Sequence, residues 1–302
     1  MERYSDNGLC NYIENAVRCG AETNLKFYDL SKSLLVVARK EDNWPIALFI
    51  DDRCSDPSEN AITPADKEYG RVCYLLARKA GLPLVWIRYV DDHQLTNDSL
   101  VYLAVPELRQ KFYRVKIGEI ARILRDNYGI GCVLRNKTPQ KEKNDSLSSA
   151  FHLWQRECLD IGIFADIDLI RANNDSVSEI IELKRSYLPL ETWNPFPADS
   201  HNFEILKNLC TMLGNIPFRI VFNTQVPYGP EIEKNPGLYY QTIKQRNGEK
   251  YYDKLDKLKV FDTAVTTTGK FYTPCKGIVS TENFLLGRYP TLVYKKRICP
   301  ER

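Results

Sequence analysis

Short apolar runs separated by polar turns predict a chain in which strands and helices alternate. In the first half, three runs of strand length precede a segment with apolar residues at helical spacing, and a strongly apolar strand follows. These segments are residues 24–30, 33–40, 44–52, 65–81 and 82–90. A further helix is expected in the second half of residues 106–129. The pattern is typical of an α/β fold.

The second half of the chain predicts the order helix, strand, strand, helix, strand. The expected elements are residues 145–162, 163–170, 176–186, 199–214 and 216–224. Beyond them, residues 249–261 are predicted to form one helix. Residues 135–146 carry a proline and no apolar side chain, which favours a linker, with a long surface loop as the alternative. The sequence thus suggests two domains, residues 1–134 and residues 146–302.

Composition and charge set few limits on function. The chain has 302 residues, of which 43% are hydrophobic and 27% are charged, and its net charge is only +3. No run approaches the roughly 18 apolar residues of a membrane span, and residues 1–20 lack the apolar core of a signal peptide. Nine cysteines without Cys-x-x-Cys spacing favour reduced thiols over disulfides or a zinc site. A cytoplasmic protein is expected.

Charged residues interrupt two of the apolar runs at alternate positions. Because successive side chains of a strand point to opposite faces, Asp166 shares a face with Asp168, and Glu182 shares a face with Lys184. If the two strands pair as a hairpin, three carboxylates and one ammonium come together. Such carboxylates repel unless a cation neutralises them, and oxygen ligands suit Mg²⁺ or Mn²⁺. A lysine beside the metal can hold an attacking water or stabilise charge on a phosphate.

Asp168, followed fourteen residues later by Glu182-x-Lys184, resembles the motif of the PD-(D/E)XK nuclease superfamily. The element order of residues 146–224 is similar to the core of that superfamily, although a literal Pro-Asp is absent before either aspartate. The resemblance implies an α/β fold with a restriction-endonuclease-like αβββαβ core and a mixed sheet. An N-terminal α/β domain would precede this core.

The same resemblance implies roles for individual residues. Asp168 and Glu182 would be catalytic ligands of Mg²⁺ or Mn²⁺, and Lys184 would orient the water or stabilise the transition state. Asp166 and Glu157 are the further metal ligands to expect, Glu157 from the first core helix. For each of the five, the alternative is an ordinary surface, cap or turn residue.

The resemblance also implies a partner and a reaction. We expect a metal-dependent endonuclease that hydrolyses phosphodiester bonds in double-stranded DNA, of a restriction or defence type, and a homodimer is compatible with it. Candidate phosphate contacts are Arg185, His201, Lys244 and Arg246. Two alternatives stay open: a resolvase or RNA nuclease of the same superfamily, and a non-catalytic nucleic-acid-binding protein with a nuclease fold.

The first half of the chain resembles, more faintly, nucleases of the very-short-patch-repair type. Asp29, Asp51 and Asp52 fall near the acidic positions of that layout, but Phe49 stands where another acid is expected. We therefore expect residues 1–134 to serve recognition or assembly and not to form a second catalytic centre. Asp51 and Asp52 are expected to cap a strand or shape a turn.

Overall fold

The structure is a computed structural model that describes residues 8–19, 25–27, 32–90, 94–106, 109–137, 149–173, 176–246, 249–265 and 271–290. The helices are α1 (Gly8–Arg18), α2 (Pro64–Ala80), α3 (Glu119–Tyr128), α4 (Ala150–Cys158), α5 (Ser200–Met212), α6 (Pro230–Lys234) and α7 (Thr281–Leu285), with short 3₁₀ turns at Glu59–Ala61, Pro197–Asp199 and Pro236–Leu238. None of the described helices is long and apolar enough to cross a membrane. The cysteines in the described part of the chain are free thiols.

The chain divides into two compact units. The first unit is Met1–Arg3, Leu25–Glu182 and Phe196–Phe218, and the second is Tyr4–Asn24, Leu183–Pro195 and Arg219–Arg302. The first ten strands are β1 (Leu25–Phe27), β2 (Lys32–Ala38), β3 (Pro45–Arg53), β4 (Leu84–Tyr89), β5 (Leu100–Val105), β6 (Arg109–Lys116), β7 (Val133–Leu134), β8 (Leu159–Asp160), β9 (Ile163–Ile167) and β10 (Leu169–Asn173). The remaining strands are β11 (Ser176–Ser186), β12 (Phe218–Pro227), β13 (Tyr239–Arg246), β14 (Glu249–Asp262), β15 (Ala264–Val265), β16 (Phe271–Tyr272) and β17 (Cys275–Ser280).

A six-stranded mixed sheet forms the centre of the first unit. Its strand order is β6-β5-β4-β3-β2-β9. Strands β3 and β4 are parallel and are connected through α2, whereas the other neighbours are antiparallel. Helix α2 begins at a capping box formed by Thr63 and Asp66 and ends at Gly81, whose φ of 69° is left-handed. The apolar runs of β2, β3 and β4 are buried because helices cover both faces of the sheet.

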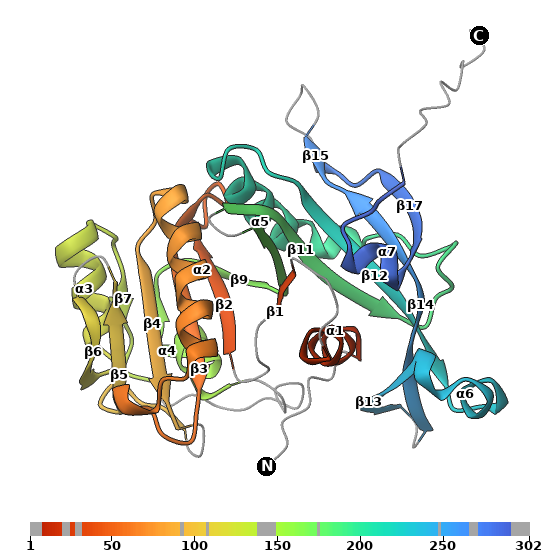
Figure 1. Ribbon diagram of the computed structural model, residues 1–302. Coiled ribbons are helices and arrows are strands. Elements are labelled where there is room, and N and C mark those ends of the chain that lie inside the picture. Colours follow the sequence, from red (N-terminus) through yellow and green to blue (C-terminus); the bar gives the residue numbers. More distant parts are fainter. Residues whose placement is uncertain are drawn as a thin grey trace, which may run out of the picture. The chain divides into compact units, whose positions relative to one another are not determined.

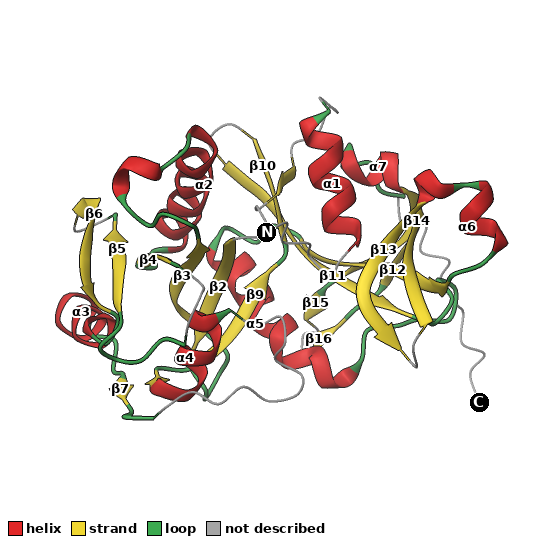
Figure 2. Ribbon diagram, turned by 90° about the horizontal axis from the view of Figure 1, so that it is seen from below, coloured by secondary structure: helices red, strands yellow, loops and turns green. Residues whose placement is uncertain are grey.

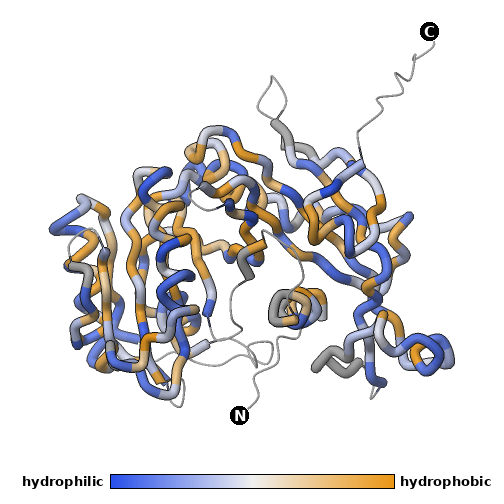
Figure 3. Tube along the Cα trace, viewed as in Figure 1, coloured by the Kyte–Doolittle hydropathy of each residue, from blue (hydrophilic) through white to orange (hydrophobic). Residues whose placement is uncertain are grey.

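The two faces of this sheet have different helical partners. Figure 2 shows α2 on one face and α4 on the other. On the α4 face, Phe151 stacks on Phe49 with ring centroids 5.9 Å apart, and Trp154 joins the same core. Helix α5 packs against β9, β2, β3 and α2. Hydropathy follows this layering, since the apolar residues concentrate along the central strands (Figure 3).

A second sheet has the strand order β1-β10-β11-β12-β14-β13, with β17 paired to β14. In the second unit, β12, β13 and β17 each pair antiparallel with β14, and these strands curl into a half-barrel (Figure 1). Helix α1 packs against β13 and β14, and α7 packs against β14 and β17. Buried Trp193 stacks on Phe222 at 4.2 Å. The protein is therefore a mixed α/β protein with two mixed sheets, one of them a curled half-barrel.

The order helix, strand, strand, helix, strand is present between α4 and β12, with two departures from expectation. The apolar run 163–170 is two strands, β9 and β10, which are separated by Asp168 and belong to different sheets. The helix predicted for residues 249–261 is wrong, because this segment forms β14. Partner strands on both sides of β14 satisfy its backbone, and this tertiary pairing outweighs a weak local preference.

The compact units cut the chain elsewhere than at the linker expected from the sequence. Strand β9, which follows that segment, pairs with β2, which precedes it, so residues 1–134 and 146–302 contribute strands to one sheet. Most of the expected linker, residues 138–146, lies outside the described residues. A functional division between the two segments stays a prediction.

Candidate functional site

Asp168 and Glu182 come together through the hairpin of β10 and β11. The two strands pair antiparallel, with Leu169 opposite Ile181 at the start of β10. One register step further, Asp168 lies opposite Glu182, and opposite residues of such a pair share a face with Cβ atoms about 5 Å apart. Asp168 is half-buried and Glu182 is buried. The hairpin expected from the sequence is present and brings these two carboxylates to one place.

Lys184 and Asp166 relate differently to this pair. Strand β11 continues through half-buried Lys184, and alternation along the strand places it on the face of Glu182. Asp166 belongs to β9, lies opposite Leu35 of β2 and is exposed. Because β9 and β10 lie in different sheets, the alternation expected to align Asp166 with Asp168 is interrupted between them. The expectation of one continuous strand is therefore corrected, and the ladder positions Asp166 against β2.

Glu157 of α4 has cationic neighbours of its own. Its carboxylate lies 4.0 Å from the Nζ of Lys137 and 3.5 Å from the Nε of Arg156. Among the residues that the structure describes, no three His, Cys, Asp or Glu side chains form a group that could hold a metal ion. The Asp168–Glu182 pair thus stands without Glu157 as a third ligand. Two carboxylates still suit Mg²⁺, which keeps several waters and often takes its remaining ligands from substrate phosphates.

Arg185, a candidate phosphate contact, lies against a buried carboxylate in the second unit. Its Nη1 is 3.4 Å from the Oδ2 of Asp253, and its side chain is only 15% exposed. Asp253 also accepts hydrogen bonds from the backbone N–H of Gly8 at 2.6 Å and from the Nδ2 of Asn223 at 3.1 Å. Burial raises the pKa of Asp253, and the Arg185 guanidinium acts in the opposite direction. A Cβ at position 8 would lie 2.6 Å from Oδ2, so this contact requires glycine.

The other three candidate phosphate contacts lie on separate elements. His201 of α5 is exposed, and its Nδ1 is 3.0 Å from the Nδ2 of Asn43, in the turn between β2 and β3. Lys244 and Arg246 belong to β13, and their side chains lie outside what the structure describes. A shared phosphate-binding surface for these residues stays a prediction.

Asp51 and Asp52 lie within β3, so the expectation that they cap a strand end or shape a turn is wrong. The strand continues to Arg53, and both carboxylates are buried. Asp51 accepts hydrogen bonds from the hydroxyl of Tyr89 at 2.8 Å and from the Oγ of Ser149, the N-cap of α4, at 2.6 Å. It therefore links β3, β4 and α4 on one face of the sheet.

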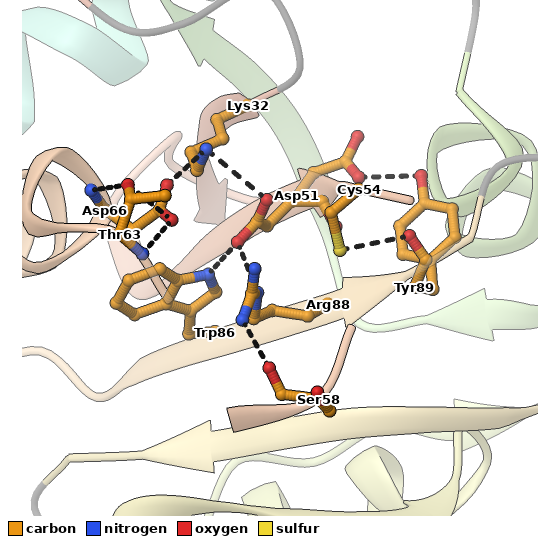
Figure 4. Close-up of polar contacts among 10 residues, drawn as sticks. Lys32, Asp51, Cys54, Ser58, Thr63, Asp66, Trp86, Arg88 and Tyr89 are labelled. Carbon is orange, nitrogen blue, oxygen red and sulfur yellow. Dashed lines mark hydrogen bonds and ion pairs between the residues drawn. The ribbon is translucent and has the colours of Figure 1, made fainter. Parts of the chain in front are cut away.

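Asp52 joins an ion-pair network on the opposite face. Its Oδ2 accepts hydrogen bonds from the Nε1 of Trp86 and the Nε of Arg88, both at 2.9 Å. The Nζ of Lys32 lies 3.6 Å from its Oδ1 and 2.7 Å from the Oδ1 of Asp66. Figure 4 shows Lys32 beside Asp66, with Trp86 and Arg88 projecting from β4. All four charged side chains are buried.

A cavity of about 360 Å³ adjoins this network, and burial controls its titratable groups. Desolvation raises the pKa of Asp52, although Lys32 and Arg88 act against it. Desolvation also acts on Asp66, but the hydrogen bonds from Lys32 and Thr63 outweigh it and lower its pKa. Burial, and then Asp52, raise the pKa of Cys54 to about 11, so this thiol stays protonated at neutral pH. The cavity is lined by residues that include Lys32, Cys54, Thr63, Asp66, Tyr69 and Arg88.

The sequence held one signal for this network that local reading misses. Arg88 is the one charged residue of the otherwise apolar run 82–90. A charge inside a strand with covered faces needs a buried partner, and two acids end the neighbouring apolar run at Asp51 and Asp52. Lys32 completes the network from the start of β2, and its place there depends on the pairing of β2 with β3.

Comparisons of the chain with protein-family models, with curated proteins and with solved structures found no match in any of the three.

Proposed function

We propose that the chain is a metal-dependent endonuclease that hydrolyses phosphodiester bonds in nucleic acid, with double-stranded DNA as its substrate. The observation that carries the proposal is the position of Asp168 opposite Glu182, with Lys184 two residues further along the same strand. In this account α4, β9, β10, β11, α5 and β12 are the counterparts of a restriction-endonuclease-like core.

Asp168 and Glu182 would hold one Mg²⁺ or Mn²⁺ between them. When bound, such an ion polarises a phosphate oxygen and lowers the pKa of a coordinated water. Lys184 would hold the attacking water or neutralise the charge that develops on the phosphate. Burial of Glu182 strengthens both interactions, because charges attract more strongly where water is excluded.

The second candidate is a nucleic-acid-binding protein that retains the fold without catalysis. The observation that favours it is the lack of a group of three metal-binding side chains in the described part of the chain. Lys184 favours the enzyme, since binding alone does not require an ammonium two residues after Glu182.

Incubation with supercoiled plasmid, linear duplex, single-stranded DNA and RNA, with and without Mg²⁺, separates these candidates. We expect metal-dependent cleavage of duplex DNA, its loss in Glu182→Gln, and its retention in the matched variant Glu157→Gln. Cleavage of RNA alone would indicate the RNA nuclease. Binding without cleavage would support the binding protein, and neither binding nor cleavage would reject both candidates.

A further inference from the structure

Two parts of the first unit repeat one backbone plan. The hairpin β2–β3 is followed by α2 and β4, and the hairpin β10–β11 is followed by α5 and β12. Both helical segments begin at a proline, Pro64 in α2 and Pro197 in the 3₁₀ turn that leads into α5. A glycine with left-handed φ follows each helix, Gly81 at 69° and Gly214 at 91°.

One backbone hydrogen bond aligns the two plans residue by residue. The N–H of Leu48 in β3 donates to the carbonyl of Pro83 at 2.9 Å, and the N–H of Ile180 in β11 donates to the carbonyl of Pro217 at 3.1 Å. Leu48 and Ile180 therefore hold the same position. The alignment is independent of side-chain identity, because backbone groups make these bonds.

Counting along the aligned strands pairs the candidate catalytic residues with residues of β2 and β3. Glu182, two residues after Ile180, corresponds to Ile50. Asp168, opposite Glu182, corresponds to Leu34, which lies opposite Ile50. Leu34 and Ile50 are both 0% exposed. The position expected to hold an acid is thus that of Ile50, and its buried apolar side chain offers no ligand to a hard cation.

The position of Lys184 corresponds to Asp52, four residues after Leu48, and Asp52 lies opposite Lys32. The ammonium of Lys32 lies between Asp52 and Asp66, at 3.6 and 2.7 Å. Two carboxylates around one buried cation resemble the first ligands of a divalent ion, with an ammonium in the place of the metal. The adjoining cavity has room for the waters that such an ion would keep.

The leading strands of the two plans are exchanged. Strand β1, which precedes β2, pairs with β10, and β9, which precedes β10, pairs with β2. Each hairpin is thus flanked by the strand that leads into the other one. The hairpin β2–β3 therefore supports β9 and the approach to Asp168, whatever its own chemistry.

We propose that β2–β3–α2–β4 is a silent repeat of β10–β11–α5–β12, in which the Lys32 ammonium permanently fills the cation position. The consequence that chemistry is confined to the hairpin β10–β11 rests on the proposed function. The assignment of Lys32 as a resident cation does not.

The test asks whether removing Lys32 creates a divalent-metal site. Thermal unfolding is measured with and without millimolar Mn²⁺ in a Glu182→Gln background, which removes a ligand of the candidate catalytic metal. We expect Lys32→Ala in this background to gain a metal-dependent rise in Tm of about 5 °C relative to Glu182→Gln alone. If Lys32→Ala is unfolded without metal, Mn²⁺ should restore its circular dichroism spectrum.

Two controls make the result specific. Adding Asp66→Asn to the Lys32→Ala variant should abolish the gain, because one of the two carboxylate ligands is lost. Lys40→Ala in the Glu182→Gln background should gain nothing, since Lys40 contacts a single carboxylate, that of Asp160. No rise and no refolding with Mn²⁺, or an equal rise after Asp66→Asn, would overturn the inference. Absence of cleavage by the wild-type protein would instead contradict the proposed function, because this readout needs no activity.

Discussion

Asp168 lies opposite Glu182, one register step beyond the last pair of the β10–β11 ladder. At Asp168 the chain leaves β9, which pairs with β2, and enters β10, which pairs with β1 and β11. A residue between two sheets is not held by a ladder on either side. Its carboxylate is therefore suited to approach a ligand that the regular strands would exclude.

Asp168→Asn and Glu182→Gln should each weaken divalent-ion binding and cleavage together. Both substitutions keep the side-chain shape and remove the charge that holds the ion. Without metal, each should raise Tm, because neighbouring carboxylates repel. Calorimetric titration with Mn²⁺ measures the affinity, and unchanged affinity in both variants would exclude the metal role.

Lys184→Ala should lower the single-turnover cleavage rate by about 10²–10³ and leave substrate affinity near that of the wild type. The reason is that a preorganised positive charge acts mainly on the transition state. Lys67→Ala, which removes an exposed lysine of α2, is the control and should cut normally. A Lys184→Ala rate within a few-fold of the wild type would refute this role.

Asp66→Asn should destabilise the protein by about 2 kcal/mol at pH 7, with an effect that shrinks in acid. The folded-state pKa of Asp66 is lowered from 3.8, so its contribution is complete above that value and is lost as pH falls through the folded pKa. Denaturant unfolding of both proteins from pH 7 to pH 3 measures the difference. A difference that grows below pH 4 would have the wrong sign.

Arg185→Ala should destabilise the protein by about 3 kcal/mol, because it leaves the buried carboxylate of Asp253 without its cation. Asp253→Asn added to Arg185→Ala should recover part of this loss, since no buried charge then remains. Denaturant unfolding of the two single variants and the double variant gives the coupling energy. If Arg185→Ala instead weakened DNA binding at unchanged stability, Arg185 would be a phosphate contact, as the sequence suggests.

Local patterns predicted the elements but not their partners. The runs that became β2, β3, α2 and β4 were evident because burial on both faces makes such strands continuously apolar. The choice of β9 to pair with β2 depends on a contact across more than a hundred residues, which no local period encodes. The same reason explains Asp52, whose partners Lys32 and Arg88 reach it from two neighbouring strands.

The candidate site was predicted to the same depth. A spacing of two along one strand and a hairpin turn identify Glu182 and its opposite residue Asp168, since both follow from strand geometry. Glu157 and Asp166 depended on how α4 and β9 pack, and these elements position them beside Lys137 and Leu35 instead.

The most direct test of a single catalytic centre in the hairpin β10–β11 compares two variants in single-turnover cleavage of end-labelled duplex DNA with Mg²⁺. Glu182→Gln should cut at least about a hundredfold more slowly than the wild type. The double variant Asp51→Asn, Asp52→Asn should cut within a few-fold of the wild type, at a temperature where circular dichroism shows it folded. Cleavage at the wild-type rate by Glu182→Gln, or a hundredfold loss in the folded double variant, would contradict the account.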